Sequence, residues 1–402
     1  MNILFYCNEY PPYKTGGIGT VTKIVAEALV KRGHKVFVIG YYPTDKTLPS
    51  FSIINGVHIY RYNLGLQNGK IKSLIFSILH KLKLSQLIIQ KELTYTENKI
   101  QELITKEKIE ILELTDYYKF ISQSTGLLEF KKFSIPTILR IHGSVSFLDE
   151  LKGIKEPIKI KNDAAHFHRC NYISAVSQYS LDYIEQNFKT NNFKFQTVIY
   201  NPLEDRFISP TPPSGSNTVL FIGKVVETKG CFSLLKAFNI CAAKYPHITL
   251  KIIGNGDIEK ARQYIKPEFT NRVSFLGFCT REQIEQEIDS CAFACIPTYF
   301  ENFSMAALEI MGRQRVLIYT ERTSGKEVID HGINGYTINP ENITEIANTI
   351  SILYENIPLR NKLAKNAYAK IKENFSLNEI INSIEFFYTK VIEYDKENNK
   401  KN

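Results

Sequence analysis

The densest group of residues able to do chemistry lies in the segment PTYFENFSMAALEIMG, residues 297–312. Glu301 precedes an apolar run of helical period, and Glu309 follows eight residues later. A helix that begins near Asn302 or Phe303 would place Glu309 about two turns further along the same face. Its N-terminus would expose the backbone amides of Phe303, Ser304 and Met305. Because an acid buried in an apolar helix needs a partner, sugar or ribose hydroxyls are suitable ligands, although a capped amphipathic helix with one satisfied acid gives the same pattern.

A glycine turn with two cations opens the second half of the chain, in FIGKVVETKG at 221–230. Lys224 lies beside Gly223, and Lys229 lies beside Gly230. The order of these residues differs from the G-x-x-x-x-G-K-[ST] of a phosphate-binding P-loop, which argues against ATP hydrolysis. Two lysines beside a glycine turn can still neutralise a diphosphate, but surface lysines near turns are also common.

A second glycine turn, KTGGIGT at 14–20, joins the expected first strand to the first helix. Gly16 and Gly17 would let the backbone approach an anion at the helix N-terminus, and a tight turn alone would need the same glycines. The dinucleotide fingerprint is not met, because Thr22 occupies its third glycine position. The strand ending at Gly40 also carries no acid for a ribose, so a nicotinamide enzyme is disfavoured.

Three further polar side chains follow buried strands. His142 comes directly after the run TILRI, and ligands gather at the carboxyl edge of a parallel sheet. Glu113 and Asp116, at the end of IEILEL, are expected to point to the same edge. They could hold acceptor hydroxyls, act as a base, or cap a loop. Two histidines inside a helical run are interpreted as structural: His166 and His168.

Short apolar runs alternate with segments of helical period along most of the 402 residues. This pattern predicts parallel sheets covered by helices on both faces. The first-half strands are expected at 3–7, 34–40, 57–62, 109–114, 137–143, 172–177 and 196–202. The second-half strands are expected at 218–225, 248–254, 272–278, 292–298, 316–320 and 335–339.

Residues 204–218 contain three prolines and one glycine and indicate an interdomain linker. We therefore expect domains at 1–203 and 204–375, with a C-terminal helix at 376–402 that packs back on the first domain. The seven cysteines are odd in number and lie mostly in apolar stretches, which favours buried thiols over disulfides or a metal site. No apolar run is long enough to cross a bilayer, and the first residues do not resemble a signal peptide, so we expect a cytoplasmic location.

Eight short segments together carry a family resemblance. They are GGIG at 16–19, IHG at 141–143, SAVSQYS at 174–180, VIYNPLE at 198–204, FIGKVVETKG at 221–230, IIGNGD at 252–257, FLGF at 275–278 and ENFSMAALE at 301–309. In this order and spacing the chain resembles the nucleotide-sugar-dependent glycosyltransferases of family 4 over nearly its whole length. The resemblance implies the GT-B fold, in which two Rossmann-like domains face each other across a cleft.

The resemblance also implies roles for residues around the donor phosphates. Lys224 and Lys229, beside Gly223, would hold the diphosphate of a UDP- or GDP-sugar, and the Gly16–Gly17 backbone would approach it from the other domain. Relatives often have Arg where Lys224 stands, so this contact would be a point charge without a bidentate fork.

Around the donor sugar, the resemblance implies that Glu309 holds the ribose hydroxyls and that Glu301 faces the sugar hydroxyls. His142 would lie near the transferred sugar, which makes His142, Glu301 and Lys229 the catalytic candidates. The helix-start amides of Phe303, Ser304 and Met305 would meet the sugar or a phosphate. Two departures from the family weaken any inference about which sugar is used: Thr323-Ser324-Gly325 stands where many relatives have a Gly-Gly pair, and Arg315 where many have Pro.

The family generally keeps the donor's anomeric configuration, and nothing in this sequence resembles the carboxylate pair of a retaining hydrolase. We therefore expect the acceptor hydroxyl to attack on the face from which the nucleotide diphosphate leaves. No Asp-x-Asp motif is present, and lysines can replace a metal, so no metal or other cofactor is expected. Two alternatives remain: a nucleotide-sugar epimerase of the same fold, and a non-catalytic basic scaffold that binds membranes.

The formal charge of +9 belongs wholly to the first half, where residues 1–200 hold 26 basic and 17 acidic side chains. It is densest around the segment 69–91, which contains five lysines, no acid and an apolar stripe of helical period. Such a helix can lie on an anionic membrane surface, or it can pack on the core with its lysines solvated. We expect a peripheral membrane contact and a glycan, lipid-linked or lipopolysaccharide-type acceptor, and we expect no nucleic-acid partner.

Overall fold

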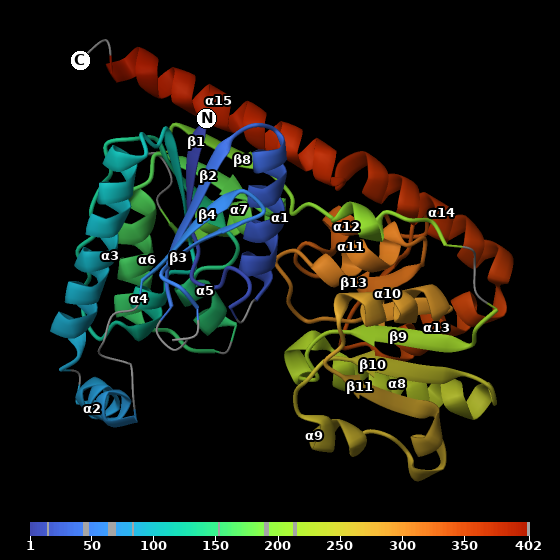
Figure 1. Ribbon diagram of the computed structural model, residues 1–402. Helices are drawn as coiled ribbons and strands as arrows, with labels where there is room; N and C mark the ends of the chain where they lie inside the picture. The colour runs from blue at the N-terminus through green and yellow to red at the C-terminus, as the bar shows by residue number, and fades with distance from the viewer. Residues whose placement is uncertain are drawn as a thin grey trace. The chain divides into compact units, whose positions relative to one another are not determined.

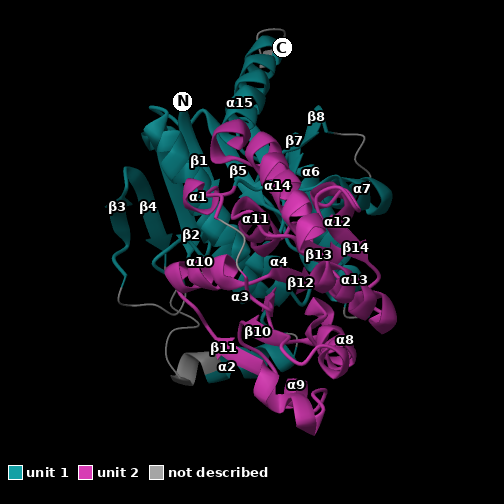
Figure 2. Cartoon of the chain, turned by 90° about the vertical axis from the view of Figure 1, so that its right-hand side faces the viewer, with its two compact units in different colours: residues 1–202, 381–402 teal, residues 203–380 magenta. Residues whose placement is uncertain are grey.

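The computed structural model describes residues 1–13, 16–42, 48–62, 70–82, 84–151, 153–188, 193–211 and 215–399, without the side chains of 70–73 and 399. The chain forms two compact units, Met1–Pro202 with Ile381–Asn402, and Leu203–Ile380. Figure 2 shows that the chain leaves the first unit once and re-enters it through its last helix. Each unit is built around one sheet, and the predicted α/β class is confirmed.

The first unit contains an eight-stranded sheet of order β3-β4-β2-β1-β5-β6-β7-β8. All neighbouring pairs are parallel except β3 with β4. The strands are β1 (Asn2–Tyr6), β2 (Lys35–Tyr41), β3 (Phe51–Ile54), β4 (Val57–Tyr62), β5 (Ile111–Thr115), β6 (Thr137–Ile141), β7 (Tyr172–Ala175) and β8 (Phe195–Val198). The strand order reverses between β1 and β5, which makes this the switch point where doubly wound sheets bind ligands.

The antiparallel strand β3 was not predicted. It forms a two-residue hairpin with β4 through Asn55 and Gly56, whose φ angles are 49° and 82°. An Asn-Gly pair between apolar runs is the strongest short-range signal for such a turn. The sequence therefore contained the information for this strand.

Helices cover both faces of this sheet. They are α1 (Gly17–Lys31), α2 (Lys70–Lys81), α3 (Gln86–Lys106), α4 (Lys119–Gln123), α5 (Val145–Glu150), α6 (Pro157–His168), α7 (Gln178–Asn187) and the last helix, α15 (Leu377–Asn399). The alternate strand residues Leu4, Tyr6, Leu112 and Leu114 share one apolar cluster with α3 and α6. Figure 1 shows α3 and α1 on opposite sides of the sheet.

The last helix packs on the first unit through polar contacts as well as apolar ones. Glu385 accepts from His34 at 2.7 Å, and the Tyr388 hydroxyl donates to Glu113 at 2.6 Å. The Tyr394 ring meets Phe195 edge-on at 4.7 Å between centroids. These contacts attach residues far along the chain to the sheet that the chain forms first.

The second unit contains a six-stranded, wholly parallel sheet of order β11-β10-β9-β12-β13-β14. Its strands are β9 (Thr218–Ile222), β10 (Thr249–Ile253), β11 (Val273–Gly277), β12 (Phe293–Ile296), β13 (Leu317–Thr320) and β14 (Tyr336–Ile338). The helices are α8 (Cys231–Lys244), α9 (Ile258–Arg262), α10 (Arg281–Ser290), α11 (Met305–Gly312), α12 (Gly325–Val328), α13 (Ile343–Glu355) and α14 (Ile357–Asn374). The order reverses between β9 and β12, so this unit has its own switch point.

Within the segment 69–91, Lys70–Lys81 form α2, and α3 begins at Gln86. Four residues of the expected apolar stripe point outward: the side chains of Leu74, Ile75, Ile78 and Leu82 are 62%, 51%, 49% and 61% exposed. Phe76 instead packs against the core of the unit. Ile71, Lys70, Lys72 and Lys83 lie outside the described side chains, whereas Lys81 and Lys91 are described and exposed. The apolar stripe is therefore not the face that packs on the core.

All seven cysteines are free thiols, and all but Cys279 are buried, as predicted. Within the part of the chain that the structure describes, no helix combines the length and the apolar character needed to cross a membrane.

Candidate active site

The switch point of the second unit gathers most of the residues predicted to bind the donor. β9 ends at Ile222 and is followed by Gly223, Lys224 and a single 3₁₀ turn, Glu227–Lys229. β12, its neighbour, ends at Ile296 and is followed by the loop that carries Glu301. Because parallel neighbouring strands end at the same edge, these two loops lie side by side.

The two loops are held together by close backbone contact. Gly230 has φ 72°, and a Cβ there would lie 1.8 Å from the carbonyl oxygen of Pro297. Only glycine fits this position. The Thr228 carbonyl accepts from the Thr298 hydroxyl at 3.1 Å and from the Tyr299 amide at 3.0 Å. The position of the lysine turn is therefore fixed relative to the loop that carries Glu301.

Lys229 and Glu301 form an ion pair, with 2.5 Å between Nζ and Oε2. Both side chains are half-buried, and Nζ also donates to the carbonyl of Phe300 at 3.5 Å. The backbone of Glu301 is held from the loop that follows β13, since its carbonyl accepts from the Ser324 hydroxyl at 3.1 Å. The structure thus brings together two of the three catalytic candidates. Lys224, on the same turn, is exposed.

Helix α11 begins later than predicted, at Met305 instead of near Asn302 or Phe303. The Ser304 side chain caps it by accepting from the Ala307 amide at 3.3 Å, which fixes the start two or three residues further along. Phe303 precedes the cap, and its ring packs at 5.7 Å from that of Phe375. Glu309 therefore lies about one turn from the helix start, so the expected two turns were wrong.

Glu309 is buried and paired with Arg281, the first residue of α10. The Arg281 guanidinium donates to Glu309 at 2.6 Å and to Glu204 at 2.7 Å, so it bridges two carboxylates. Burial raises the pKa of Glu309, and the Arg281 charge opposes that shift. Sequence reasoning missed this arginine, because a pairing between residues 28 positions apart cannot be read from local spacing.

In the first unit, the predicted glycine turn meets a carboxylate of the protein itself. The Glu9 carboxylate accepts from the amides of Gly16 and Gly19, each at 3.0 Å. Gly16 caps α1 and Gly17 is its first residue. Glu9 thus lies where an anion would be expected at this helix start. The neighbouring residues 14 and 15 lie outside the described part of the chain.

The structure separates Glu113 from Asp116. Asp116 is fully buried and accepts from the amides of His142 and Gly143, both at 2.8 Å, and from that of Tyr117. Glu113 instead accepts from Tyr388 on the opposite side of the strand. The expectation that both point to one edge was wrong: Glu113 lies inside β5 and contacts α15, whereas Asp116 follows the end of β5 and contacts the loop after β6.

His142 follows β6 at the carboxyl edge of the sheet, as its sequence position indicated. Burial and the nearby Arg140 charge lower its pKa to about 3, so the ring is neutral at pH 7. The pKa of Asp116 is raised by burial to about 7 against three backbone hydrogen bonds. His142 is therefore suited to hydrogen bonding and not to carrying a positive charge.

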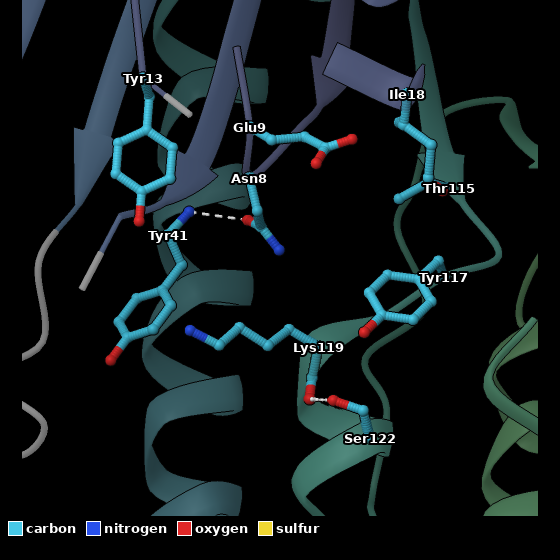
Figure 3. A pocket seen from close by; sticks show the side chains of 9 residues that line it. All are labelled: Asn8, Glu9, Tyr13, Ile18, Tyr41, Thr115, Tyr117, Lys119 and Ser122. Carbon is cyan, nitrogen blue, oxygen red and sulfur yellow. Dashed lines mark hydrogen bonds between the residues drawn. The ribbon is translucent and has the colours of Figure 1, made fainter. Parts of the chain in front are cut away.

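A cavity of about 270 Å³ opens at the switch point of the first unit. Its walls come from the ends of β1, β2 and β5 and from α1 and α4, as Figure 3 shows. The lining residues are Asn8, Glu9, Tyr13, Ile18, Tyr41, Thr115, Tyr117, Lys119 and Ser122. None was predicted as a site residue, although several follow expected strands. The missing information was the strand order, which places β1 beside β5.

Among the described residues, no group of three or more His, Cys, Asp or Glu side chains is arranged to hold a metal ion.

Comparison with known proteins identifies the class. The family described as Glycosyltransferase Family 4 matches residues 15–206, and the family described as Glycosyl transferases group 1 matches residues 204–370. The two matched regions together cover residues 15–370 of this chain. The chain therefore belongs to the family-4 type of glycosyltransferases.

Curated relatives agree with this class. An uncharacterised glycosyltransferase of Methanocaldococcus jannaschii is 24% identical over 94% of this chain and 96% of its own length. The capsular polysaccharide biosynthesis glycosyltransferase CapM of Staphylococcus aureus is 21% identical over 60% of this chain and 61% of its own.

Solved structures show the same GT-B fold. Sucrose-phosphate synthase from Thermosynechococcus elongatus superimposes with a TM-score of 0.76 at 16% identity, covering 98% of this chain and 99% of that one. Anabaena HepE in complex with UDP gives a TM-score of 0.70 at 18% identity, covering 97% and 100%.

Proposed function

We propose that this glycosyltransferase moves a sugar from a UDP- or GDP-sugar to a hydroxyl of a glycan or lipid-linked acceptor, with retention of the donor's anomeric configuration. The observation that carries the proposal is the Lys229–Glu301 ion pair at the switch point of the second unit. A cation for phosphate and an acid for hydroxyls stand there in contact, at the edge where doubly wound sheets bind nucleotides. Anabaena HepE, which has the same fold, binds UDP.

Donor binding exchanges partners within this pair. The diphosphate competes with Glu301 for Lys229, since phosphate oxygens are strong acceptors for an ammonium group. The released carboxylate then accepts from hydroxyls of the donor sugar. Glu309, held by Arg281 through one oxygen, offers its other oxygen to the ribose.

Transfer proceeds on one face of the donor sugar. The acceptor oxygen forms a bond to the anomeric carbon, the bond from that carbon to the β-phosphate oxygen breaks, and the acceptor proton passes to the leaving oxygen. Lys224, Lys229 and the N-terminus of α11 stabilise the charge that develops on the diphosphate. His142 remains neutral and orients the sugar by hydrogen bonding.

Release of nucleoside diphosphate tests the function directly. Sugars of UDP, GDP and ADP are incubated with the protein, with and without a crude glycan or lipid-linked acceptor fraction. Acceptor-dependent release, with the new linkage in the donor's configuration, is expected. Acceptor-independent conversion of the donor to its isomer would identify an epimerase instead. Absence of turnover and binding with every donor would contradict the proposal.

In the proposed reaction, lysine side chains neutralise the diphosphate in place of a metal ion. We expect an excess of EDTA to change the rate by less than about twofold, because cationic side chains already meet the diphosphate. Loss of activity on chelation, with recovery on adding Mg²⁺ or Mn²⁺, would overturn this point.

The acceptor is proposed to belong to surface polysaccharide or lipopolysaccharide synthesis and to lie at a membrane. CapM, a relative, is named for capsular polysaccharide biosynthesis. The outward-facing Leu74, Ile75 and Ile78 of α2, with nearby lysines, have the chemistry of an interfacial helix.

Vesicle binding tests the membrane contact. Co-sedimentation with vesicles rich in phosphatidylglycerol is expected at low salt and should fall several-fold in Leu74→Ser/Ile78→Ser. Ile240→Ser, which removes an exposed apolar side chain in the other unit, is the control. Equal binding by all three proteins would exclude α2 as the contact.

A further inference from the structure

The cavity beside β1 and β5 contains an ammonium group in unusual surroundings. Lys119 begins α4, and its side chain crosses the cavity toward Tyr41, with Tyr117 on the other side (Figure 3). The ammonium nitrogen lies 5.0 Å from the centre of the Tyr41 ring. Within the described part of the chain, no carboxylate oxygen lies within 4.0 Å of it.

Two acids around the cavity do not form an ion pair with Lys119. Glu9 lines the same cavity, but its carboxylate is occupied by the amides of Gly16 and Gly19. Glu92, on α3, interacts with Lys119 only at longer range, and burial raises its pKa to about 7. Both Glu92 carboxyl oxygens are buried without a hydrogen-bond partner among the described residues. Lys119 is thus a partly buried cation without a close counter-charge, and burial lowers its pKa.

The remaining walls suit a sugar ring. Three tyrosines supply ring faces and hydroxyl groups: Tyr13, Tyr41 and Tyr117. Asn8 and Thr115 add amide and hydroxyl groups at the strand ends. At about 270 Å³ the cavity is slightly smaller than the roughly 300–1,000 Å³ typical of small-molecule sites, which favours one sugar residue over a nucleotide sugar.

We propose that this cavity binds an acceptor sugar that carries an acidic substituent, a carboxylate or a phosphate, and that Lys119 pairs with that substituent. The inference rests on the proposed glycosyl transfer, and it adds the chemical class of the acceptor. An anionic group supplies the counter-charge that Lys119 lacks, while the aromatic and hydroxyl walls hold the ring.

Matched probes test the preference. Ligand-observed NMR titrations at 0.15 M salt compare methyl glucoside, methyl glucuronide and glucose 6-phosphate with the full-length protein. At this salt concentration the net positive charge of the protein surface is largely screened. At least one anionic probe should bind about tenfold or more tightly than methyl glucoside, and the two anionic probes distinguish carboxylate from phosphate. Equal affinity for all three, or no binding, would overturn the proposal.

Substitutions locate the preference. In Lys119→Met the affinities for the anionic probes and for methyl glucoside should agree within about twofold. Lys119→Arg should keep most of the difference between them, because the arginine retains the charge. Lys161→Met, at an exposed lysine of the same unit, is the control and should change nothing. A preference that survives Lys119→Met would overturn the assignment. Circular dichroism and the melting temperature establish that each variant is folded.

Donor binding separates this inference from the proposed function. UDP should raise the melting temperature of Lys119→Met as it raises that of the unchanged protein, because Lys119 lies in the other unit from Lys229. If the donor binds and turns over but the anionic probes show no preference, only the inference about the acceptor fails. If no nucleotide sugar binds or turns over, the proposed function fails whichever probe the cavity prefers.

Discussion

At the switch point of the second unit the charged side chains are already paired, Lys229 with Glu301 and Glu309 with Arg281. At the switch point of the first unit, Lys119 stands among tyrosines without a carboxylate within ion-pair distance among the described residues. Both sheets reverse their strand order at one point, and the side chains at these two switch points differ. Paired charges suit a ligand that replaces one partner, such as a diphosphate, whereas an unpaired cation suits a ligand that brings its own charge.

The largest effect is expected from removing the phosphate cation. Lys229→Met should lower kcat about 100- to 1,000-fold, because the leaving diphosphate loses a charge placed to stabilise it. Lys244→Met is the matched control, since Lys244 also pairs with an acid of the same unit but on the surface. Steady-state kinetics with the best donor measure both variants. Equal losses in the two would contradict a special role for Lys229.

A smaller effect is expected at the second pair. Glu309→Gln should weaken nucleoside diphosphate binding about 10- to 100-fold, the range for losing a hydrogen bond to a charged group. Calorimetry with UDP or GDP measures it. Glu204→Gln removes the other partner of Arg281 and should change the affinity by less than about threefold. If the two variants bind equally weakly, the effect passes through Arg281 and not through the ribose.

The smallest effect concerns stability in the first unit. Burial raises the pKa of Glu92 to about 7, so the folded protein binds the proton of this side chain more tightly than the unfolded chain does. The stabilisation from that proton is complete below about pH 4.5, the ordinary pKa of a glutamate, and is lost as pH rises through 7. Glu92→Gln should therefore raise the free energy of unfolding at pH 8 by about 3 kcal/mol and change it little at pH 4.5.

Denaturant titrations at the two pH values measure this difference. Glu129→Gln, at an exposed acid of the same unit, should be neutral at both. Asp116 and Asp163, whose pKa values burial raises to about 7 and about 6, keep part of the pH dependence in every variant. If Glu92→Gln is no more stable than the unchanged protein at pH 8, ionisation of Glu92 does not destabilise the fold and this prediction is wrong.

Much of the fold followed from the sequence because strand and helix periods are local. Each expected strand run overlaps a strand of the structure, and the α/β class is confirmed. The start of α11 was misplaced because a serine cap competes with the apolar pattern, and the cap at Ser304 determined it. The strand β3 was missed although Asn55–Gly56 marks its turn.

The sites were harder to predict from the sequence than the fold, because they depend on strand order and on pairs of residues far apart in the chain. The contact between Lys229 and Glu301 joins residues 72 positions apart and was not predicted; the family resemblance implied only that both residues serve the donor site. Nothing local indicated that Arg281 holds Glu309 or that Glu9 occupies the start of α1. The cavity around Lys119 exists because β1 and β5 are neighbours, which no periodicity reveals.

A crystal structure with bound UDP or GDP is the most direct test of whether the switch point of the second unit binds the donor. We expect to find the diphosphate against Lys229, with Glu301 displaced from that lysine, and the ribose hydroxyls against Glu309. A nucleotide found in the Lys119 cavity, or bound with the Lys229–Glu301 pair intact and Glu309 untouched, would contradict it.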